Sequence, residues 1–108
     1  MPHARTLARL VLCGILSCPS LLAASAKTLH VTVENVAFGD LPADAQVGDV
    51  VEWANKDFVA HTATARDGSF DVNLMPGKSG RIVLKHPGKI AFYCRYHPTM
   101  TGEITVAR

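Results

Sequence analysis

The chain has 108 residues, so it holds at most one domain. It carries 11 basic and 9 acidic side chains, and neither this small excess nor the placement of the basic residues is typical of a nucleic-acid-binding protein. Function must therefore be sought in particular residues rather than in overall charge.

Residues 1–26 have the layout of a secretory signal peptide. Arg5 and Arg9 give a positive start, and an apolar run follows. The small residues at 24–26 (Ala-Ser-Ala) form a cleavage site at its end. We therefore expect an exported, periplasmic protein whose mature part is a single domain at 27–108.

Two other interpretations of this leader stay open. An uncleaved anchor helix is disfavoured because the apolar run is short for a membrane span and is interrupted by Gly14, Ser17 and Pro19. A lipoprotein signal built on Cys18 is disfavoured by the proline that directly follows. The mature form is expected to have no membrane span.

Removal of the leader changes the charge and the cysteine count. Nine basic and nine acidic side chains remain in residues 27–108, so this part of the chain is formally neutral. Cys13 and Cys18 leave with the leader, and Cys94 remains without a partner for an internal disulfide. A lone thiol is at risk in an oxidising compartment, and small domains often need a staple, so Cys94 is expected to bind a metal.

Strand patterns follow in chain order from Lys27. Leu29, Val31 and Val33 alternate with polar residues, which is typical of a half-buried strand. Strands are predicted at 28–38, 49–55, 61–66, 80–85, 88–94 and 102–108. The segment 67–80 is predicted to be a loop-rich connection that begins with a hairpin-type Asp-Gly turn. Short strands separated by Gly and Pro turns predict an all-β Greek-key β-sandwich.

The segment "FYCRYHPTM" at 92–100 holds three groups that bind soft metals. Cys94, His97 and Met100 follow one another with two residues between each pair. Residues 27–108 offer three further imidazoles, at His30, His61 and His86. The first falls on the polar face of its strand and the last lies in a turn, so both are expected to be exposed.

His61 is the best candidate for a fourth ligand, since it begins an apolar-flanked strand and is expected to point into the sandwich. Two imidazoles, one thiolate and one weak thioether are the ligand set of a type 1 blue-copper site. Thiolate and thioether favour Cu(I), whereas imidazole serves both oxidation states, so such a site suits the exchange of one electron. The predicted metal ligands are His61, Cys94, His97 and Met100, and the predicted cofactor is one copper ion.

The sequence resembles the cupredoxins, the small blue-copper proteins, and within them the amicyanin, pseudoazurin and plastocyanin-like branch. The matching segments are "NKDFVAHTAT" around His61 and "YCRYHPTMTG" around Cys94. The resemblance implies a Greek-key sandwich with copper near one end, Met100 as axial ligand, and the His97 ring edge as the route for electrons. One difference is Thr62, since many relatives have asparagine after the first ligand histidine. The Thr62 hydroxyl is still expected to bond to the loop that carries Cys94.

Other site chemistries are less favoured. Zinc can occupy a two-histidine, one-cysteine site, but a methionine ligand favours copper. A catalytic pair of Cys94 and His97 has no evident orienting Asp or Asn. A binuclear copper site needs a second cysteine in the loop, where Arg95 and Tyr96 stand.

We therefore predict a carrier of single electrons between larger redox proteins, monomeric and not an enzyme. A donor and an acceptor protein are expected to dock near His97, with Arg95, Met75 and Pro98 as contacts. Trp53 is expected to pack in the core. The alternative function is a periplasmic copper-binding protein for copper delivery, storage or resistance.

Overall fold

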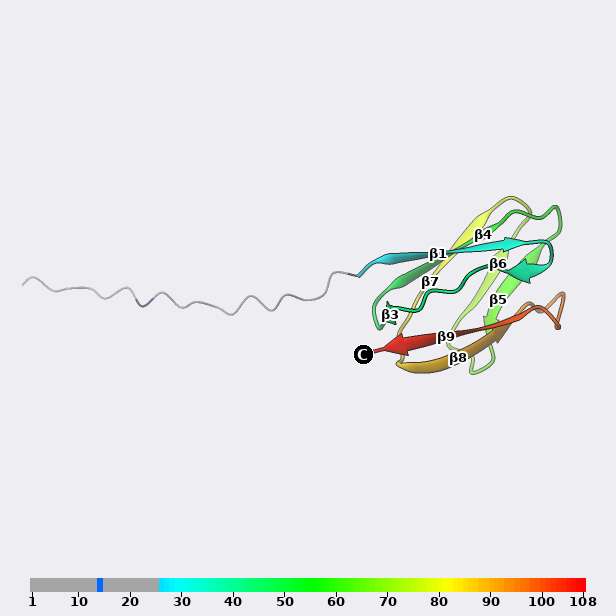
Figure 1. The fold of residues 1–108 in the computed structure, drawn as a ribbon. Coiled ribbons are helices and arrows are strands. Elements are labelled where there is room, and N and C mark those ends of the chain that lie inside the picture. The colour runs from blue at the N-terminus through cyan, green and yellow to red at the C-terminus, as the bar shows by residue number, and fades with distance from the viewer. Residues whose placement is uncertain (1–13, 15–25) are drawn as a thin grey trace, which may run out of the picture.

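Nine strands make up the regular structure in the part of the chain that the computed structural model describes, which is Gly14 and residues 26–108 (Figure 1). They are β1 (Thr28–Glu34), β2 (Ala37–Phe38), β3 (Ala45–Gln46), β4 (Val50–Asn55), β5 (His61–Ala65), β6 (Asp71–Leu74), β7 (Ser79–Val83), β8 (Gly88–Tyr93) and β9 (Thr101–Ala107). Within these described residues there is no helix of the length and apolar character needed to cross a membrane. The predicted signal peptide falls almost entirely outside the described residues.

The strands form two sheets that face each other. One sheet has the order β2-β1-β4-β7, and the other has the order β3-β9-β8-β5-β6. β1 runs parallel to β4 and β3 runs parallel to β9, while the other paired neighbours are antiparallel. The predicted all-β Greek-key sandwich is confirmed.

Aromatic side chains fill the space between the sheets. Trp53 and Phe92 are fully buried, and their ring centroids lie 4.9 Å apart in an edge-to-face arrangement. Phe38 packs edge-on against Phe92 at 4.7 Å. Gly102 is required beside this cluster, because a Cβ atom there would collide with the Phe92 ring. The predicted core role of Trp53 is confirmed.

Two predicted segments differ from the structure. The segment 28–38 is not one strand, because Asn35 and Val36 adopt left-handed backbone angles with φ of +55° each and turn the chain back into β2. The segment 67–80 is not only a loop, because β6 forms inside it and pairs with β5. In the first segment a turn that the hydrophobic pattern does not reveal ends the strand, and in the second a strand of four residues follows the predicted Asp-Gly turn.

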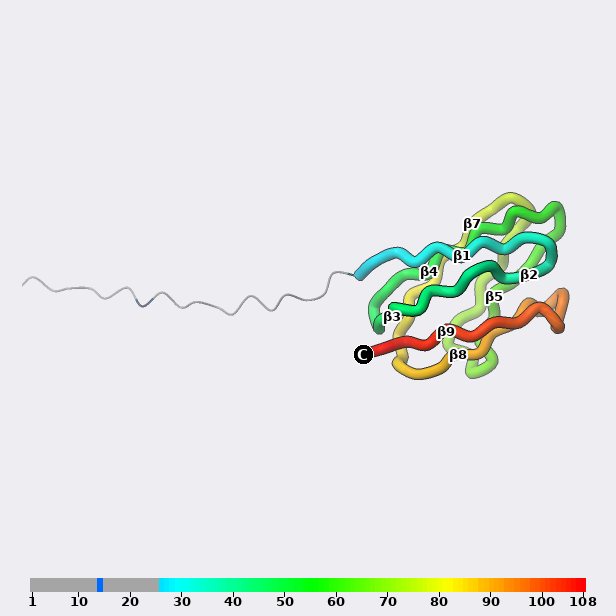
Figure 2. The backbone as a smooth tube through the Cα atoms, viewed as in Figure 1, coloured from blue at the N-terminus to red at the C-terminus, as the bar shows by residue number. Residues whose placement is uncertain are grey.

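Four loops meet at one end of the sandwich. β1 and β4 run parallel and end side by side, with Val33 opposite Asn55. β6 and β8 finish at the same end, and the chain returns from there through β7 and β9 (Figure 2). This end therefore brings together segments that are far apart in the sequence.

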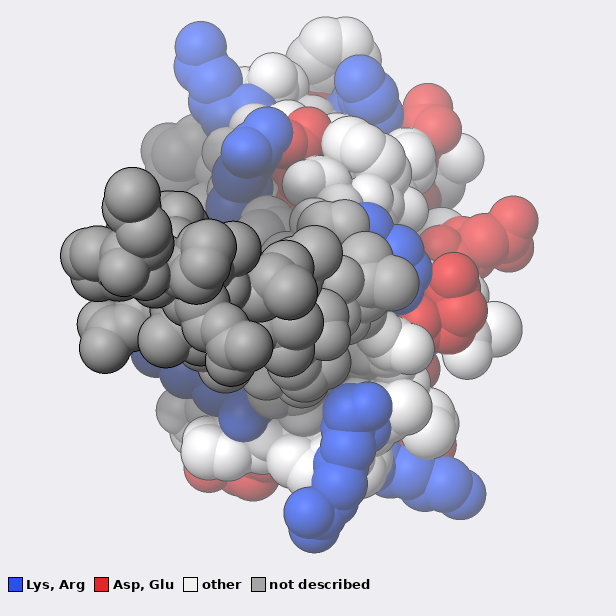
Figure 3. Space-filling view, turned by 90° about the vertical axis from the view of Figure 1, so that its left-hand side faces the viewer, with Lys and Arg blue, Asp and Glu red and all other residues white. Residues whose placement is uncertain are grey.

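The opposite end is closed by Lys27 and Asp49. The buried Asp49 carboxylate accepts the Lys27 main-chain N–H at 3.1 Å and its ammonium group at 2.8 Å. The pair lowers the pKa of Asp49 and raises that of Lys27. Figure 3, which views the molecule from this end, shows basic side chains spread around the rim rather than gathered in one patch.

Candidate metal centre

The loop between β8 and β9 is folded into two successive turns. His97 N–H donates to the Cys94 carbonyl at 3.3 Å, and Met100 N–H donates to the His97 carbonyl at 2.8 Å. Cys94 N–H in turn donates to the Met100 carbonyl at 3.0 Å and closes the loop. Pro98 suits the second position of its turn because its φ is fixed there. Side chains three residues apart fall on the same side of such turns, which explains the spacing of the three donor residues.

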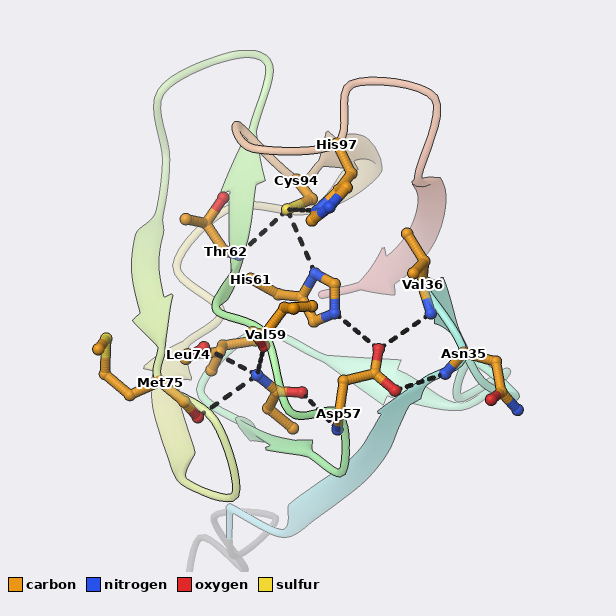
Figure 4. A network of polar contacts seen from close by, with 11 residues as sticks. Asn35, Val36, Asp57, Val59, His61, Thr62, Leu74, Met75, Cys94 and His97 are labelled. Carbon is orange, nitrogen blue, oxygen red and sulfur yellow. Dashed lines mark hydrogen bonds and ion pairs between the residues drawn. The ribbon is translucent and has the colours of Figure 1, made fainter.

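Two imidazoles approach one sulfur in this loop (Figure 4). Nδ1 of His61 lies 3.7 Å from the Cys94 Sγ atom, and Nδ1 of His97 lies 3.8 Å from it. All three donor atoms lie within 4.8 Å of one another. His61 and Cys94 are fully buried, whereas His97 is partly exposed.

The Cys94 sulfur is set up to be a thiolate. Burial raises the pKa of this thiol, but hydrogen bonds outweigh that effect. The donors are Thr62 N–H at 3.3 Å, the His97 imidazole and a main-chain N–H of the loop. Together they lower the pKa of Cys94 to about 6. The thiolate is the form that binds metals, so the loop holds Cys94 ready for one.

Asp57 holds the other edge of the His61 ring. One oxygen of its carboxylate lies 2.7 Å from His61 Nε2. The main-chain N–H groups of Asn35 and Val36 donate to the same carboxylate at 2.8 and 2.9 Å. The Val36 N–H, the imidazole and the Asn35 N–H lower the pKa of Asp57, so it is a carboxylate at neutral pH.

Asn55 fixes the loop that carries Asp57. Its side-chain oxygen accepts the Asp57 N–H at 2.9 Å. Its buried amide donates to the carbonyls of Val59 and Leu74 at 2.9 Å each, and to that of Met75 at 3.3 Å. One buried side chain thus ties the β4–β5 loop to the β6–β7 loop.

Thr62 links β5 to the ligand loop twice. Its N–H donates to the Cys94 sulfur, and its hydroxyl oxygen accepts Arg95 N–H at 2.9 Å. Thr64 donates its hydroxyl to the Asp71 carboxylate, so the Thr62 hydroxyl donates to Thr64. The expected bond from Thr62 to the ligand loop is present.

The structure brings together the predicted residues His61, Cys94 and His97 and buries Met100 at the end of their loop. His30 and His86 lie on the surface, as expected. Sequence reasoning missed the contribution of Asp57 and Asn55. The segment "NKD", which precedes His61, could have pointed to them. It is part of the match to the family, but the sequence analysis gave the Asn55 and Asp57 side chains no role.

An orienting carboxylate contacts His61, whereas none is seen within residues 26–108 at His97, the histidine of the catalytic pair that the sequence analysis considered. Asp57, His61 and Cys94 follow one another as carboxylate, imidazole and thiol, an order also found in cysteine enzymes. However, the Cys94 sulfur is fully buried and His97 faces it as a second imidazole. Two imidazoles around one inaccessible sulfur suit a metal better than a substrate.

Known proteins resemble this chain in sequence and in fold. A family model for the cupredoxin-like domain matches residues 6–106. The methylamine utilization protein MauL of Methylorubrum extorquens is 31% identical over an alignment of 90 residues, and the match covers 80% of this chain and 79% of MauL. A proline-to-phenylalanine variant of amicyanin in the reduced state has 19% identity and a TM-score of 0.64, over 73% of this chain and 81% of its own. A purple cupredoxin from Nitrosopumilus maritimus has 24% identity and a TM-score of 0.64, over 73% of this chain and 99% of its own.

The chain therefore belongs to the cupredoxin-like domain family, and copper is its cofactor. The two solved structures support the fold, and MauL supports the family through sequence. The donor set fits this metal, since a buried thiolate suits Cu(I) and imidazole suits both oxidation states.

Proposed function

We propose that the chain is a type 1 copper protein that carries one electron at a time between larger redox proteins. In this proposal His61, Cys94 and His97 are the strong ligands, and Met100 is the weak axial one. The observation that carries it is the approach of two Nδ1 atoms, at 3.7 and 3.8 Å, to one buried sulfur. Bound copper supplies a one-electron couple, and the residues of this chain supply the rest.

The donor groups are held by bonds that do not depend on the metal. The Cys94 main chain is fixed within the turns of its own loop, and its sulfur accepts the Thr62 N–H. His61 is fixed by Asp57. A site held in this way keeps its geometry when an electron arrives or leaves, which favours a carrier over a catalyst.

Exposed apolar side chains lie on loops at the same end of the sandwich as the partly exposed His97, and we propose that they form the docking surface for the redox partners. The ligand loop contributes Tyr96 and Pro98, and neighbouring loops of the same end contribute the others. The apolar end patch consists of Val36, Phe58, Val59, Met75, Tyr96 and Pro98. Phe58 is 99% exposed, so an apolar partner surface would gain most from covering it.

Two further observations support the cellular setting that we propose. A relative with 31% identity is named a methylamine utilization protein, so amine oxidation is the setting that we propose for the electron carrier. The leader pattern at 1–26 supports export to the periplasm. We propose that the carrier acts there as a monomer and has no enzymatic activity of its own.

Copper delivery, storage or resistance is the second candidate function. It shares the ligand set, but trafficking sites tend to be open and rich in Met or His. Residues 27–108 contain only Met75 and Met100 and no histidine-rich tract. The burial of Cys94 and His61 also favours a site that exchanges electrons rather than the metal.

The first experiment is the absorption spectrum of residues 27–108 with one equivalent of Cu(II). We expect an intense band in the red that ascorbate bleaches, because a thiolate–copper bond gives charge transfer. Cys94→Ser is expected to lose the band. His30→Ala, which changes an exposed histidine outside the site, is expected to keep it.

A weakly absorbing complex would contradict the ligand assignment. A chelator then separates the two functions: a Cu(I) complex that resists a mild chelator and exchanges electrons quickly supports the carrier. Rapid transfer of Cu(I) to that chelator would instead support copper delivery.

A further inference from the structure

Asp57 binds the edge of the His61 ring that faces away from Cys94. Its Oδ2 atom lies 2.7 Å from His61 Nε2 (Figure 4). The same oxygen accepts Val36 N–H at 2.9 Å, and Oδ1 accepts Asn35 N–H at 2.8 Å. Three donors from two separate segments therefore fix both oxygens, and the carboxylate cannot turn without losing bonds.

The β1–β2 turn is shaped to present its two N–H groups. Asn35 and Val36 both have φ of +55°, which asparagine tolerates and a β-branched residue strongly disfavours. The pair of Glu34 and Ala37 closes the turn behind them. The positive φ at Val36 is an uncommon conformation for a β-branched residue, and the main-chain bonds to Asp57 help to hold it.

The carboxylate decides which nitrogen of His61 carries the proton. An ionised carboxylate only accepts hydrogen bonds, so Nε2 is the N–H donor to Asp57. Nδ1 is then the nitrogen with the free lone pair, and it lies 3.7 Å from the Cys94 sulfur. The ring therefore presents its metal-binding nitrogen to the thiolate before any metal arrives.

We propose that Asp57, held by the Asn35–Val36 turn, is the positioning residue of the metal centre: it fixes the tautomer and orientation of His61 and makes this imidazole a stronger donor to Cu(II). A carboxylate that accepts from the far nitrogen raises the basicity of a ligand histidine. This inference rests on the proposed copper site. It assigns Asp57 the tuning of the reduction potential toward lower values, because stronger donation favours Cu(II).

The two histidines are unequal in this respect. Among residues 26–108, no hydrogen bond acceptor is seen at Nε2 of His97, and its ring is partly exposed. His61 is buried and anchored. His61 can therefore set the donor strength at the metal, while His97 is left to face a redox partner.

The test compares Asp57→Asn, Asp57→Ala and Asp57→Glu with the unaltered protein. In the metal-free protein, NMR of the imidazole nitrogens is expected to show His61 protonated at Nε2, and a mixture of tautomers in Asp57→Ala. In the copper-loaded protein, the Asn and Ala variants are expected to have a raised reduction potential and about 10–100-fold weaker Cu(II) binding. Asp57→Glu keeps the carboxylate, so part of the original reduction potential and of the Cu(II) affinity is expected to be retained.

Asp67→Asn is the matched control, since it removes the same charge at the other end of β5. An equal shift of potential in Asp67→Asn, or an unchanged tautomer and potential in the Asp57 variants, would overturn the inference. If Asp57→Ala does not fold, the Asn and Glu variants decide by the same two measurements. If the unaltered protein gives no red band, the proposed function fails, while the tautomer of the metal-free protein still decides the role of Asp57.

Discussion

Thr62 shows how one residue can serve a site without touching the metal. Its N–H stabilises the Cys94 thiolate, and its hydroxyl holds the Arg95 main chain at 2.9 Å. The hydroxyl is in turn fixed by Thr64. The family resemblance places an asparagine here in many relatives, and a short hydroxyl reaches the loop in this chain because β5 and the loop lie close together.

The thiol of Cys94 gives a prediction about pH. In the metal-free protein, thiolate absorbance in the ultraviolet is expected to appear with a midpoint near pH 6, because the hydrogen bonds from Thr62 and His97 outweigh burial. An ordinary cysteine titrates near pH 8.5. Since the folded pKa lies below the unfolded one, the free energy of unfolding is expected to rise between about pH 6 and pH 8.5. That gain is lost as the pH falls through the folded pKa.

Cys94→Ser is the control for this titration and is expected to remove both the absorbance change and this part of the pH dependence. Denaturant unfolding at several pH values measures the second effect. A midpoint at the ordinary value would show that the surrounding donors do not stabilise the thiolate.

At the scale of the elements, β8 and β9 carry the ligand loop at their shared end, and their packing fixes where the loop begins and ends. Phe92 lies two residues before Cys94, and Gly102 lies two residues after Met100. The two face each other across the strand pair, as Phe92 pairs with Gly102 in the register. The base of the loop is therefore a contact between a ring and a glycine.

Gly102→Ala tests that contact. The added Cβ would collide with the Phe92 ring, so the free energy of unfolding is expected to fall by about 1–3 kcal/mol. Urea denaturation measures the change. Thr105→Ala, on the exposed face of the same strand, is the control and is expected to change stability by less than about 0.5 kcal/mol. Equal stability of the two variants would contradict the proposed crowding.

Features made by residues close together in the sequence were predicted more readily than features made by residues far apart. Cys94, His97 and Met100 lie on one loop, so their spacing alone predicted a metal site. The alternation of apolar and polar side chains predicted most of the strands. The turn at Asn35–Val36 and the strand β6 were missed because each is short. A two-residue turn and a four-residue strand give too little alternation of apolar and polar residues to be recognised. Asp57 was missed because its role exists only where the parallel pairing of β1 and β4 brings two distant loops together.

At the scale of the whole molecule, residues 27–108 carry nine basic and nine acidic side chains, so net charge gives little attraction for a partner. Arg95 is the basic residue nearest to Cys94 in the chain, but its charge is partly compensated. Its Nε atom lies 3.2 Å from the Asp71 carboxylate, and Nη2 lies 3.0 Å from the Asn73 side-chain oxygen. Steering of an acidic partner by this residue is therefore expected to be modest.

Arg95→Gln tests the steering with small redox reagents. Reduction of the copper-loaded protein by anionic hexacyanoferrate(II) is expected to slow at low ionic strength and to approach the unaltered rate at high salt. Arg81→Gln is the matched control, because Arg81 is also paired, with Glu52, and lies on the other sheet. No change at low salt for Arg95→Gln, or an equal change for Arg81→Gln, would remove Arg95 from the docking surface.

Because the ligands are separated along the chain, it matters whether the protein folds before or after it binds the metal. Cys94, His97 and Met100 are close neighbours in the unfolded chain as well, whereas His61 is 33 residues from Cys94 and reaches the sulfur only when β5 has paired with β8. A soft metal ion that meets the unfolded chain can therefore be held by the loop alone, and such binding reduces the stability that the metal confers on the fold. The order of events thus decides the outcome: a chain that folds first offers a shaped site to an incoming ion, and a chain that binds first must fold around the ion it has already taken.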